Sequence, residues 1–374
     1  MKIGTLTFHS AYNFGSNLQA YALQKYILKL SKEYNIHVDY SIINLRTMAQ
    51  NDIYNYKNNN IIKKMIKRFL YGKILETRQK KFELFINEYL KLTKEYKTRE
   101  DIISDNVNYD LCISGSDQVW NLDAYDFDWS YYLDEIPSKK KISYAVSSGP
   151  KKNNISNTDR RKISKLVNMY DKISVREEGT RNFIKQFTNK NVSINMDPTI
   201  LLTKNEWDMI IDNRKIVNDQ YILYYSLKPS KSRVSFLKKV SKKMGIKVVV
   251  AYPALKYEIM SGFIKKYDSG PLDFLNLVKN AKLIISSSFH GTIFSIIFNV
   301  PFYALNGKND YRISTLLTVM KLEDRMIAET DNLDFICDNA FNVDFKNSNL
   351  IIRNEREKSK KYLLSALDIG DNHE

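Results

Sequence analysis

The sequence predicts an α/β protein with two parallel-sheet halves, and three observations support this fold class. The chain has 374 residues, a length that usually divides into two domains. Short runs rich in Val and Ile alternate with segments whose apolar residues recur at helical spacing, which is typical of parallel sheets. The hydrophobic content of 43% supplies ordinary cores and is far below that of a protein with many membrane spans.

The first half starts with an expected strand, "KIGTLTF", then a polar loop and a helix, "LQAYALQKYILKL". Further strands are expected at "HVDYSIINL", "YDLCISG", "KISYAVSS", "KISVRE" and "VSINMD". We expect a first domain over residues 1–203, joined by an amphipathic final helix over residues 347–368 that packs back on it.

The second half repeats this alternation from about Trp207. Strands are expected at "YILYYSL", "IKVVVAY", "KLIISSS" and "VPFYAL", with helices at "SRVSFLKKVSKK" and "PLDFLNLVKNA". We therefore expect a second domain over residues 204–346 and a hinge near residues 196–207.

A basic segment interrupts the first half. Residues 57–99 contain 13 Lys or Arg and 4 Glu, a net charge of +9 out of +16 for the whole chain. Its apolar residues predict two amphipathic helices, with a break near Tyr71 and Gly72. One interpretation is a solvated helical face; the other is a surface for anionic membrane headgroups, a lipid-linked diphosphate or nucleic acid. No helix-turn-helix, zinc-finger or RNP-type motif is visible, so no nucleic acid is expected.

The stretch "SSSFHGTIFSIIFNVPF", residues 286–302, lies in an uncharged segment between Lys282 and Lys308 that is long enough to cross a bilayer. Its serines, His290, Asn299 and Pro301 make a membrane span a poor interpretation, and no second span supports one. A buried strand, a turn and a helix fit better. His290 then lies at the carboxyl end of a strand, where open α/β sheets bind ligands. A lone histidine on an apolar face can instead be structural, whereas an imidazole at this edge can transfer a proton.

The loop "HSAYNFGSN" follows the first strand. Its glycine allows close approach of the backbone to a ligand, and the start of the next helix offers N–H groups to an anion. The loop matches neither GxGxxG nor the Walker pattern, so it indicates no dinucleotide or P-loop nucleotide. The residues expected to line an acceptor site or cleft are His9, Asn13, Gly15 and Asn17.

Two charged side chains follow other strands. Asp117, in "SGSDQVWN", is either a helix cap or a base that binds substrate hydroxyls. Arg176, in "SVREEGT", either pairs with Glu177 or Glu178 or holds a phosphate or carboxylate.

Several other classes of site are not indicated. No HxH or HExxH pattern and no paired carboxylates accompany any histidine, so no metal is expected. Cys112 and Cys337 lie in apolar surroundings without metal or redox spacing, which favours buried thiols. The absence of a secretory pattern in "MKIGTLTFHSAYNFG" and the two thiols lead us to expect a cytoplasmic protein.

Taken in order, "YNFGSNLQAYALQ", "DLCISGSDQVWN", "ISVREEGT", "NMDPTILL" and "SSSFHGTIFSIIFNVPF" resemble the polysaccharide pyruvyl transferases over nearly the whole chain. The resemblance implies a glycosyltransferase-B-like fold, with two Rossmann-like domains facing across a cleft. It implies transfer of a pyruvyl group from phosphoenolpyruvate, a co-substrate, to two sugar hydroxyls as a ketal, without a cofactor.

The resemblance also assigns residues. It makes His290 the acid/base, and it places the arginine of the family's Arg-Leu-His signature at Ser288. In a mechanism with His290 as the acid, we expect Asp117 or His9 to accept a hydroxyl proton. The remaining residues implied to bind the donor are Ser287, Phe289, Gly291, Arg176 and Arg312, the last as a substitute for the missing arginine.

The implied partners are phosphoenolpyruvate and a sugar or lipid-linked oligosaccharide, a precursor of a cell-surface polysaccharide such as a capsule or exopolysaccharide. Segment 57–99 would then contact anionic headgroups at the inner membrane face. Two alternatives stay open, a nucleotide-sugar-dependent glycosyltransferase of the same fold and a non-catalytic relative that binds sugar or nucleic acid.

Overall fold

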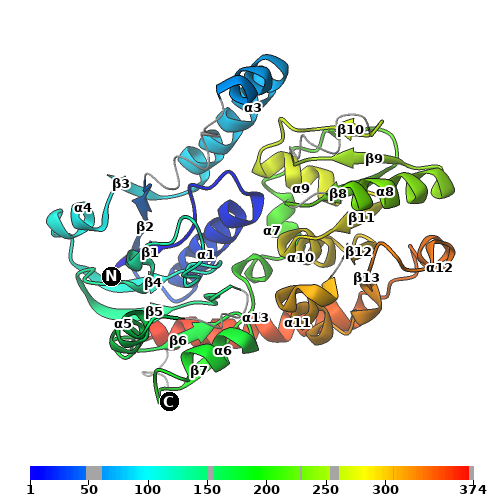
Figure 1. Cartoon of the computed structure of the whole chain (residues 1–374). Helices are drawn as coiled ribbons and strands as arrows, with labels where there is room; N and C mark the ends of the chain where they lie inside the picture. The colour runs from blue at the N-terminus through cyan, green and yellow to red at the C-terminus, as the bar shows by residue number, and fades with distance from the viewer. Residues whose placement is uncertain (48–60, 150–154, 228–229, 253–260, 306, 370–374) are drawn as a thin grey trace. The chain divides into compact units, whose positions relative to one another are not determined.

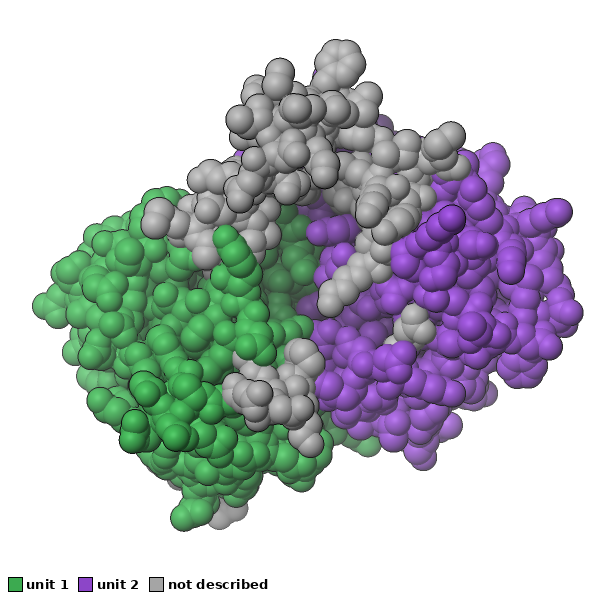
Figure 2. All heavy atoms as spheres, viewed as in Figure 1, with its two compact units in different colours: residues 1–66, 86–202, 354–374 green, residues 67–85, 203–353 purple. Residues whose placement is uncertain are grey.

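The computed structural model describes residues 1–47, 61–149, 155–227, 230–252, 261–305 and 307–369, with the backbone alone for residues 61–71. The chain divides into two compact units, which Figure 2 colours green and purple. Unit 1 comprises Met1–Ile66, Ile86–Leu202 and Asn354–Glu374. Unit 2 comprises Lys67–Phe85 and Thr203–Arg353.

Unit 1 contains a five-stranded parallel sheet with the order β3-β2-β1-β4-β5 (Figure 1). Chain order reverses between the neighbours β1 and β4, which makes this pair a switch point of the Rossmann type. A two-stranded sheet of β6 and β7 continues from β5 through the bridges Ile142–Lys172 and Val146–Val175. The strands are β1 (Lys2–Leu6), β2 (Asp39–Leu45), β3 (Leu92–Tyr96), β4 (Tyr109–Ser114), β5 (Ser138–Ser143), β6 (Ile173–Val175) and β7 (Val192–Ile194).

Unit 1 also contains α1 (Phe14–Glu33), α4 (Arg99–Ser104), α5 (Asn157–Val167), α6 (Glu178–Ile184) and the short η1 (Trp129–Tyr132) and η2 (Pro198–Leu201). Helix α13 (Lys346–Ala366) returns to this unit from Asn354 onward. There Arg356 Nη2 donates to the Leu202 carbonyl at 2.9 Å and the Tyr362 hydroxyl donates to the Ser143 carbonyl at 2.7 Å.

Unit 2 contains a six-stranded parallel sheet with the order β10-β9-β8-β11-β12-β13 (Figure 1). Its switch point lies between β8 and β11. The strands are β8 (Tyr221–Tyr225), β9 (Lys247–Val250), β10 (Ile264–Lys265), β11 (Leu283–Ser286), β12 (Phe302–Leu305) and β13 (Met326–Ile327). The helices that lie wholly in unit 2 are α7 (Lys204–Asp208), α8 (Lys231–Met244), α9 (Pro271–Lys279), α10 (Phe289–Phe298), α11 (Tyr311–Val319) and α12 (Leu333–Asp338), with the short η3 (Gly307–Asn309) and η4 (Glu323–Arg325).

The basic segment differs from its prediction. A single helix, α3 (Ile61–Tyr89), runs through Gly72, and β3 follows it, so the prediction of two helices with a break near Tyr71 and Gly72 was wrong. A glycine inside a helix lowers helix stability by about 1 kcal/mol relative to alanine, much less than the roughly 3 kcal/mol of proline, so the helix continues through Gly72. Residues 57–60 of the predicted segment lie outside the described residues.

Candidate functional site

The switch point of unit 1 brings two predicted loops together. Ser16, in the first turn of α1, donates its hydroxyl to Asp117 Oδ2 at 2.7 Å, across from the end of β4. The other oxygen, Asp117 Oδ1, accepts from the Gln118 N–H at 2.8 Å. Asp117 has a φ of +80°, in the left-handed region that Asp tolerates better than most residues. No helix is assigned directly after Asp117, so the helix-cap interpretation was wrong.

The loop after β1 is held by its own polar side chains. His9 is 1% exposed, its Nε2 lies 2.9 Å from Asn44 Oδ1 and its Nδ1 lies 3.1 Å from the Thr7 carbonyl oxygen. Asn13 caps α1 by accepting from the Gly15 N–H at 3.0 Å, and Asn17 donates to the His9 carbonyl. These contacts shape the loop, and both ring nitrogens of His9 are engaged, which makes it a poor acceptor for a hydroxyl proton.

Arg176 follows β6 and lies in a buried ion pair. Its Nη2 is 3.2 Å from Asp197 Oδ2 and 4.0 Å from Asp117 Oδ1, and it donates to Ser116 Oγ at 2.8 Å. The Arg176 side chain is 2% exposed and that of Asp197 is 0% exposed. The expected neighbours have other partners, since Glu177 accepts from Ser147 and Glu178 pairs with Arg181. The interpretation of a pair with Glu177 or Glu178 was therefore wrong.

Asp126 is a residue near this site that the sequence did not indicate. It lies half-buried in the loop between β4 and η1. Burial raises the pKa of Asp126 to about 6, and the charge of Asp117 adds to the shift. A carboxyl group that titrates near neutrality can exchange protons with a substrate. The sequence "DAYDFDW" offers several acidic residues and no signal that singles out this one.

The switch point of unit 2 carries the "SSSFHG" turn, which was predicted as a strand, a turn and a helix. Ser286 ends β11, Ser288 is the N-cap of α10 and His290 lies in its first turn, 7% exposed. The ring of Phe289 meets the His290 ring edge-on, with centroids 5.3 Å apart. The turn is folded on itself, because the Ser288 N–H donates to Ser286 Oγ at 3.0 Å.

Gly291 has a packing role in this turn. A Cβ at that position would lie 2.2 Å from Ser286 Oγ, 2.9 Å from Ser286 Cβ and 3.0 Å from a ring carbon of Tyr225. Only glycine allows α10 to approach β8 and β11 this closely. Gly291 therefore positions the backbone around His290.

A guanidinium group also meets this turn. Arg233, in the first turn of α8, donates from Nη1 to Ser226 Oγ at 3.1 Å and to Ser287 Oγ at 3.3 Å. The two hydroxyls lie 2.7 Å apart. Arg233 Nε donates to Glu329 Oε1 at 3.0 Å. The sequence had not indicated Arg233.

Arg312, the expected substitute for the signature arginine, lies in the first turn of α11. It forms a bidentate pair with Asp310, with Nε–Oδ1 at 3.0 Å and Nη2–Oδ2 at 2.6 Å. Burial alone would raise the pKa of Asp310, but the hydrogen bonds and charge of Arg312 lower it overall. Asp310 thus already occupies two donors of this guanidinium.

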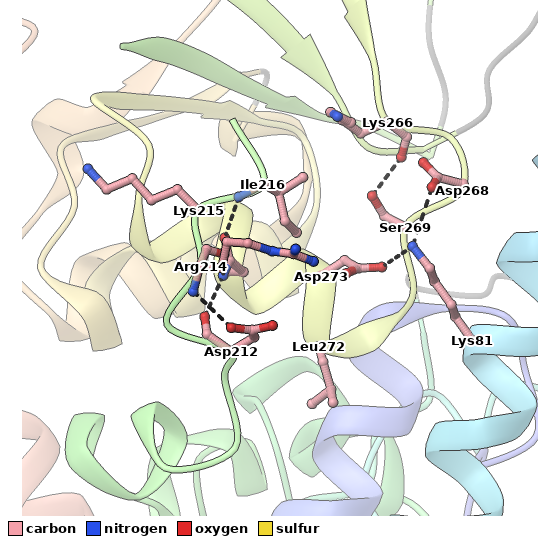
Figure 3. A pocket seen from close by; sticks show the side chains of 11 residues that line it. Lys81, Asp212, Arg214, Lys215, Ile216, Lys266, Asp268, Ser269, Leu272 and Asp273 are labelled. Carbon is pink, nitrogen blue, oxygen red and sulfur yellow. Dashed lines mark hydrogen bonds and ion pairs between the residues drawn. The ribbon is translucent and has the colours of Figure 1, made fainter. Parts of the chain in front are cut away.

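A separate pocket of about 440 Å³ lies in unit 2 (Figure 3). None of the residues predicted for the site lines it. Its Lys81 Nζ lies 2.8 Å from Asp273 Oδ2 and 3.3 Å from Asp268 Oδ2. Burial lowers the pKa of Lys81, but these two carboxylates outweigh that effect and raise it. Lys266, Arg214 and Lys215 also line the pocket, which is polar and nearly balanced in charge.

The described part of the chain shows neither a metal cluster nor a membrane-spanning helix. It contains no group of three or more His, Cys, Asp or Glu residues placed to hold a metal ion. Among the same residues, no helix is both long and apolar enough for a membrane span.

Solved structures define the class of fold. One similar structure is the UDP-N-acetylglucosamine 2-epimerase from Rickettsia bellii, with 12% identity and a TM-score of 0.55 over 98% of this chain and 97% of that chain. Another is the UDP-GlcNAc 2-epimerase from Neisseria meningitidis bound to UDP-GlcNAc, with 14% identity and a TM-score of 0.54 over 98% of this chain and 99% of that chain. A third is the UDP-GlcNAc 2-epimerase from Methanocaldococcus jannaschii, with 14% identity and a TM-score of 0.52 over 96% of this chain and 100% of that chain. A comparison with curated protein sequences gives no match. The fold is glycosyltransferase-B-like, with two Rossmann-like units.

The family follows from the sequence match. The family model of the polysaccharide pyruvyl transferases matches residues 13–309, a span that begins after β1 and includes β4, both strands of the unit 2 switch point and the "SSSFHG" turn. The chain belongs to the polysaccharide pyruvyl transferase family, and it is a transferase of polysaccharide biosynthesis.

Proposed function

We propose that this protein transfers a pyruvyl group from phosphoenolpyruvate to two hydroxyls of a sugar in a polysaccharide precursor, forming a cyclic ketal. One observation supports the proposal most. Within the segment that matches the family, unit 2 holds His290 at the start of α10, in the turn that directly follows a strand of its switch point.

The reaction balances with one proton moved to carbon and one to the leaving group. Protonation of the methylene carbon of phosphoenolpyruvate converts it to a methyl group and leaves an oxocarbenium-like centre at the adjacent carbon. One sugar hydroxyl bonds to that carbon and loses its proton. The second hydroxyl then replaces the phosphate, and its proton leaves with the phosphate. The products are the ketal and inorganic phosphate.

His290 is the residue proposed to supply the first proton. Its low exposure limits competition from water, and an imidazole can give up one proton and regain it in each cycle. Asp117 in unit 1 is the proposed acceptor of a hydroxyl proton, since each of its carboxylate oxygens has a second lone pair besides the one that accepts from Ser16 or from the Gln118 N–H. The acceptor is proposed to be a sugar or lipid-linked oligosaccharide.

The test is phosphoenolpyruvate binding by calorimetry, followed by phosphate release with a panel of saccharides and lipid-linked saccharides. We expect the wild type to bind phosphoenolpyruvate and His290→Gln to lower phosphate release about a hundredfold or more. The matched control is His37→Gln, because His37 is exposed in unit 1 and should leave turnover unchanged.

Two results would contradict the proposal. Full turnover by a folded His290→Gln variant would remove His290 from the reaction. Failure of the wild type to bind phosphoenolpyruvate, together with binding of a nucleoside diphosphate, would favour a nucleotide-sugar-dependent glycosyltransferase instead.

A further inference from the structure

Arg233 joins the carboxyl ends of two neighbouring strands in unit 2. Ser226 follows β8 directly and Ser287 follows β11 directly, and β8 and β11 are parallel neighbours. Nη1 of Arg233 donates to both hydroxyls, at 3.1 and 3.3 Å. This group of three side chains, the Arg233 cluster, lies at the switch point of the sheet, where ligands of open α/β folds bind.

The cluster has donors that an anion can use. The Ser226 and Ser287 oxygens are 2.7 Å apart, and each hydroxyl can turn its proton toward a bound oxyanion while Arg233 continues to face both oxygens. The Arg233 side chain is 16% exposed, so solvent screens its charge only in part. A guanidinium with two hydroxyls is a common donor set for phosphate.

Glu329 fixes the direction of the guanidinium. Its carboxylate accepts from Arg233 Nε at 3.0 Å and from Ser232 Oγ at 3.0 Å, and its side chain is 20% exposed. The carboxylate therefore occupies the Nε edge of the guanidinium, while Nη1 is directed at the serines. An anion at the serines would meet the cation without displacing Glu329.

We propose that the Arg233 cluster is an oxyanion subsite that binds the phosphate group of the three-carbon donor. Ser287 lies three residues before His290, so the subsite adjoins the proposed acid. The start of α10 lies in the same turn, and its N-cap, Ser288, makes no side-chain capping bond among the described residues. Arg233 then supplies the positive charge that the family resemblance would place at Ser288. The identity of the anion rests on the proposed function; the subsite itself rests on the geometry.

The alternative is that Arg233 only clamps the two strand ends together. A clamp and a subsite predict different results, because a clamp affects melting temperature and a subsite also affects anion affinity. The experiment measures binding of phosphoenolpyruvate, inorganic phosphate and pyruvate by calorimetry, with melting temperatures of each variant. The variants are Arg233→Gln, Ser287→Ala and, as matched control, Arg353→Gln, since Arg353 is exposed in unit 2.

We expect Arg233→Gln to weaken binding of phosphoenolpyruvate and inorganic phosphate about tenfold to a hundredfold, as for loss of a charged hydrogen-bond donor. Ser287→Ala should weaken both about twofold to tenfold, and it leaves the pair of Arg233 with Glu329 intact if Arg233→Gln does not fold. Arg353→Gln should bind both ligands like the wild type.

Other results would overturn the subsite, its assignment to the phosphate group or the proposed function. Unchanged phosphoenolpyruvate binding in both Arg233→Gln and Ser287→Ala would overturn the subsite and leave the proposed function standing. Weaker binding of pyruvate but not of inorganic phosphate would overturn the assignment to the phosphate group. Binding of inorganic phosphate that depends on Arg233, with no binding of phosphoenolpyruvate, would support the subsite and overturn the proposed function. No binding of any of the three by the wild type would overturn both.

Discussion

Replacing Arg176 by Met should destabilise unit 1 strongly, because it leaves a carboxylate buried without its cation. Methionine keeps much of the arginine volume and removes the charge. Asp197 Oδ1 keeps its hydrogen bonds from the Thr199 N–H at 3.0 Å and the Thr199 hydroxyl at 2.8 Å. Asp197 Oδ2 loses Arg176 Nη2, which lies 3.2 Å away.

The expected size follows from that distance and from burial. At 3.2 Å and an effective dielectric constant of about 20, the attraction between unit charges is about 5 kcal/mol. Removing one partner of a buried pair typically costs about 3–5 kcal/mol, since the remaining charge stays desolvated. We expect the free energy of unfolding of unit 1 to fall by about that amount.

Tryptophan fluorescence during urea unfolding measures this change. The chain has three tryptophans, of which Trp120 and Trp129 belong to unit 1 and Trp207 belongs to unit 2. A Trp207→Phe background therefore confines the signal to unit 1. In that background, adding Asp197→Asn to Arg176→Met should restore the lost free energy of unfolding to within about 1–2 kcal/mol of the background protein, because the neutral amide keeps the hydrogen bonds from Thr199.

A loss below about 1 kcal/mol in Arg176→Met would refute the reasoning, since it would mean that water or another group reaches Asp197. Failure of Asp197→Asn to restore stability would show that the loss came from packing and not from charge.

Two further predictions concern single groups in each unit. Gly291→Ala should lower the free energy of unfolding of unit 2 by about 1–3 kcal/mol, because the new Cβ would lie 2.2 Å from Ser286 Oγ. In the double variant, Ser286→Ala should recover part of that loss. An unchanged melting temperature in Gly291→Ala would contradict this prediction. Asp126→Asn should stabilise the protein by up to about 3 kcal/mol above pH 6 and not at all below pH 4. With its folded pKa raised to about 6, Asp126 holds its proton in the folded state while the unfolded state has already ionised, so the wild type loses stability as pH rises through this window. Urea unfolding of wild type and variant between pH 4 and 7.5 checks this, and an equal difference at all pH values would contradict it.

The central strands were predictable because they are apolar on both faces. The runs "KIGTL", "LCIS", "YILYY" and "LIIS" became β1, β4, β8 and β11, the four strands that form the two switch points. The edge strands β3, β10 and β13 were not predicted. Two of them contain only two residues, and β3, "LTKEY", has too many polar residues to stand out.

Site residues were predictable where local sequence decides their position. His290 could be placed because a turn and a helix start directly follow an apolar strand. The ion-pair partner of Arg176 could not be predicted, because the sequence suggests its neighbours Glu177 and Glu178. Asp197 comes close to Arg176 only through the pairing of β6 with β7. Arg233 lies in "SRVSFLKKVSKK", where it looks like any exposed cation of an amphipathic helix. Only the folded structure shows its contacts with Ser226 and Ser287, which follow β8 and β11.

Arg176 and Arg233 each follow a strand of a parallel sheet, yet their surroundings give them different capacities for an added anion. Nη2 of Arg176 has two carboxylates within 4.0 Å, Asp197 and Asp117, so the three groups together carry a net charge of −1. A phosphate there would add negative charge to a buried site that already has an excess of it. Among the described residues, Arg233 donates to the Glu329 carboxylate at Nε and to two hydroxyls at Nη1; the pair with Glu329 is neutral, and the hydroxyls are donors that can reorient. We therefore expect anion affinity to depend on Arg233, and Arg176 to act mainly through the stability of unit 1.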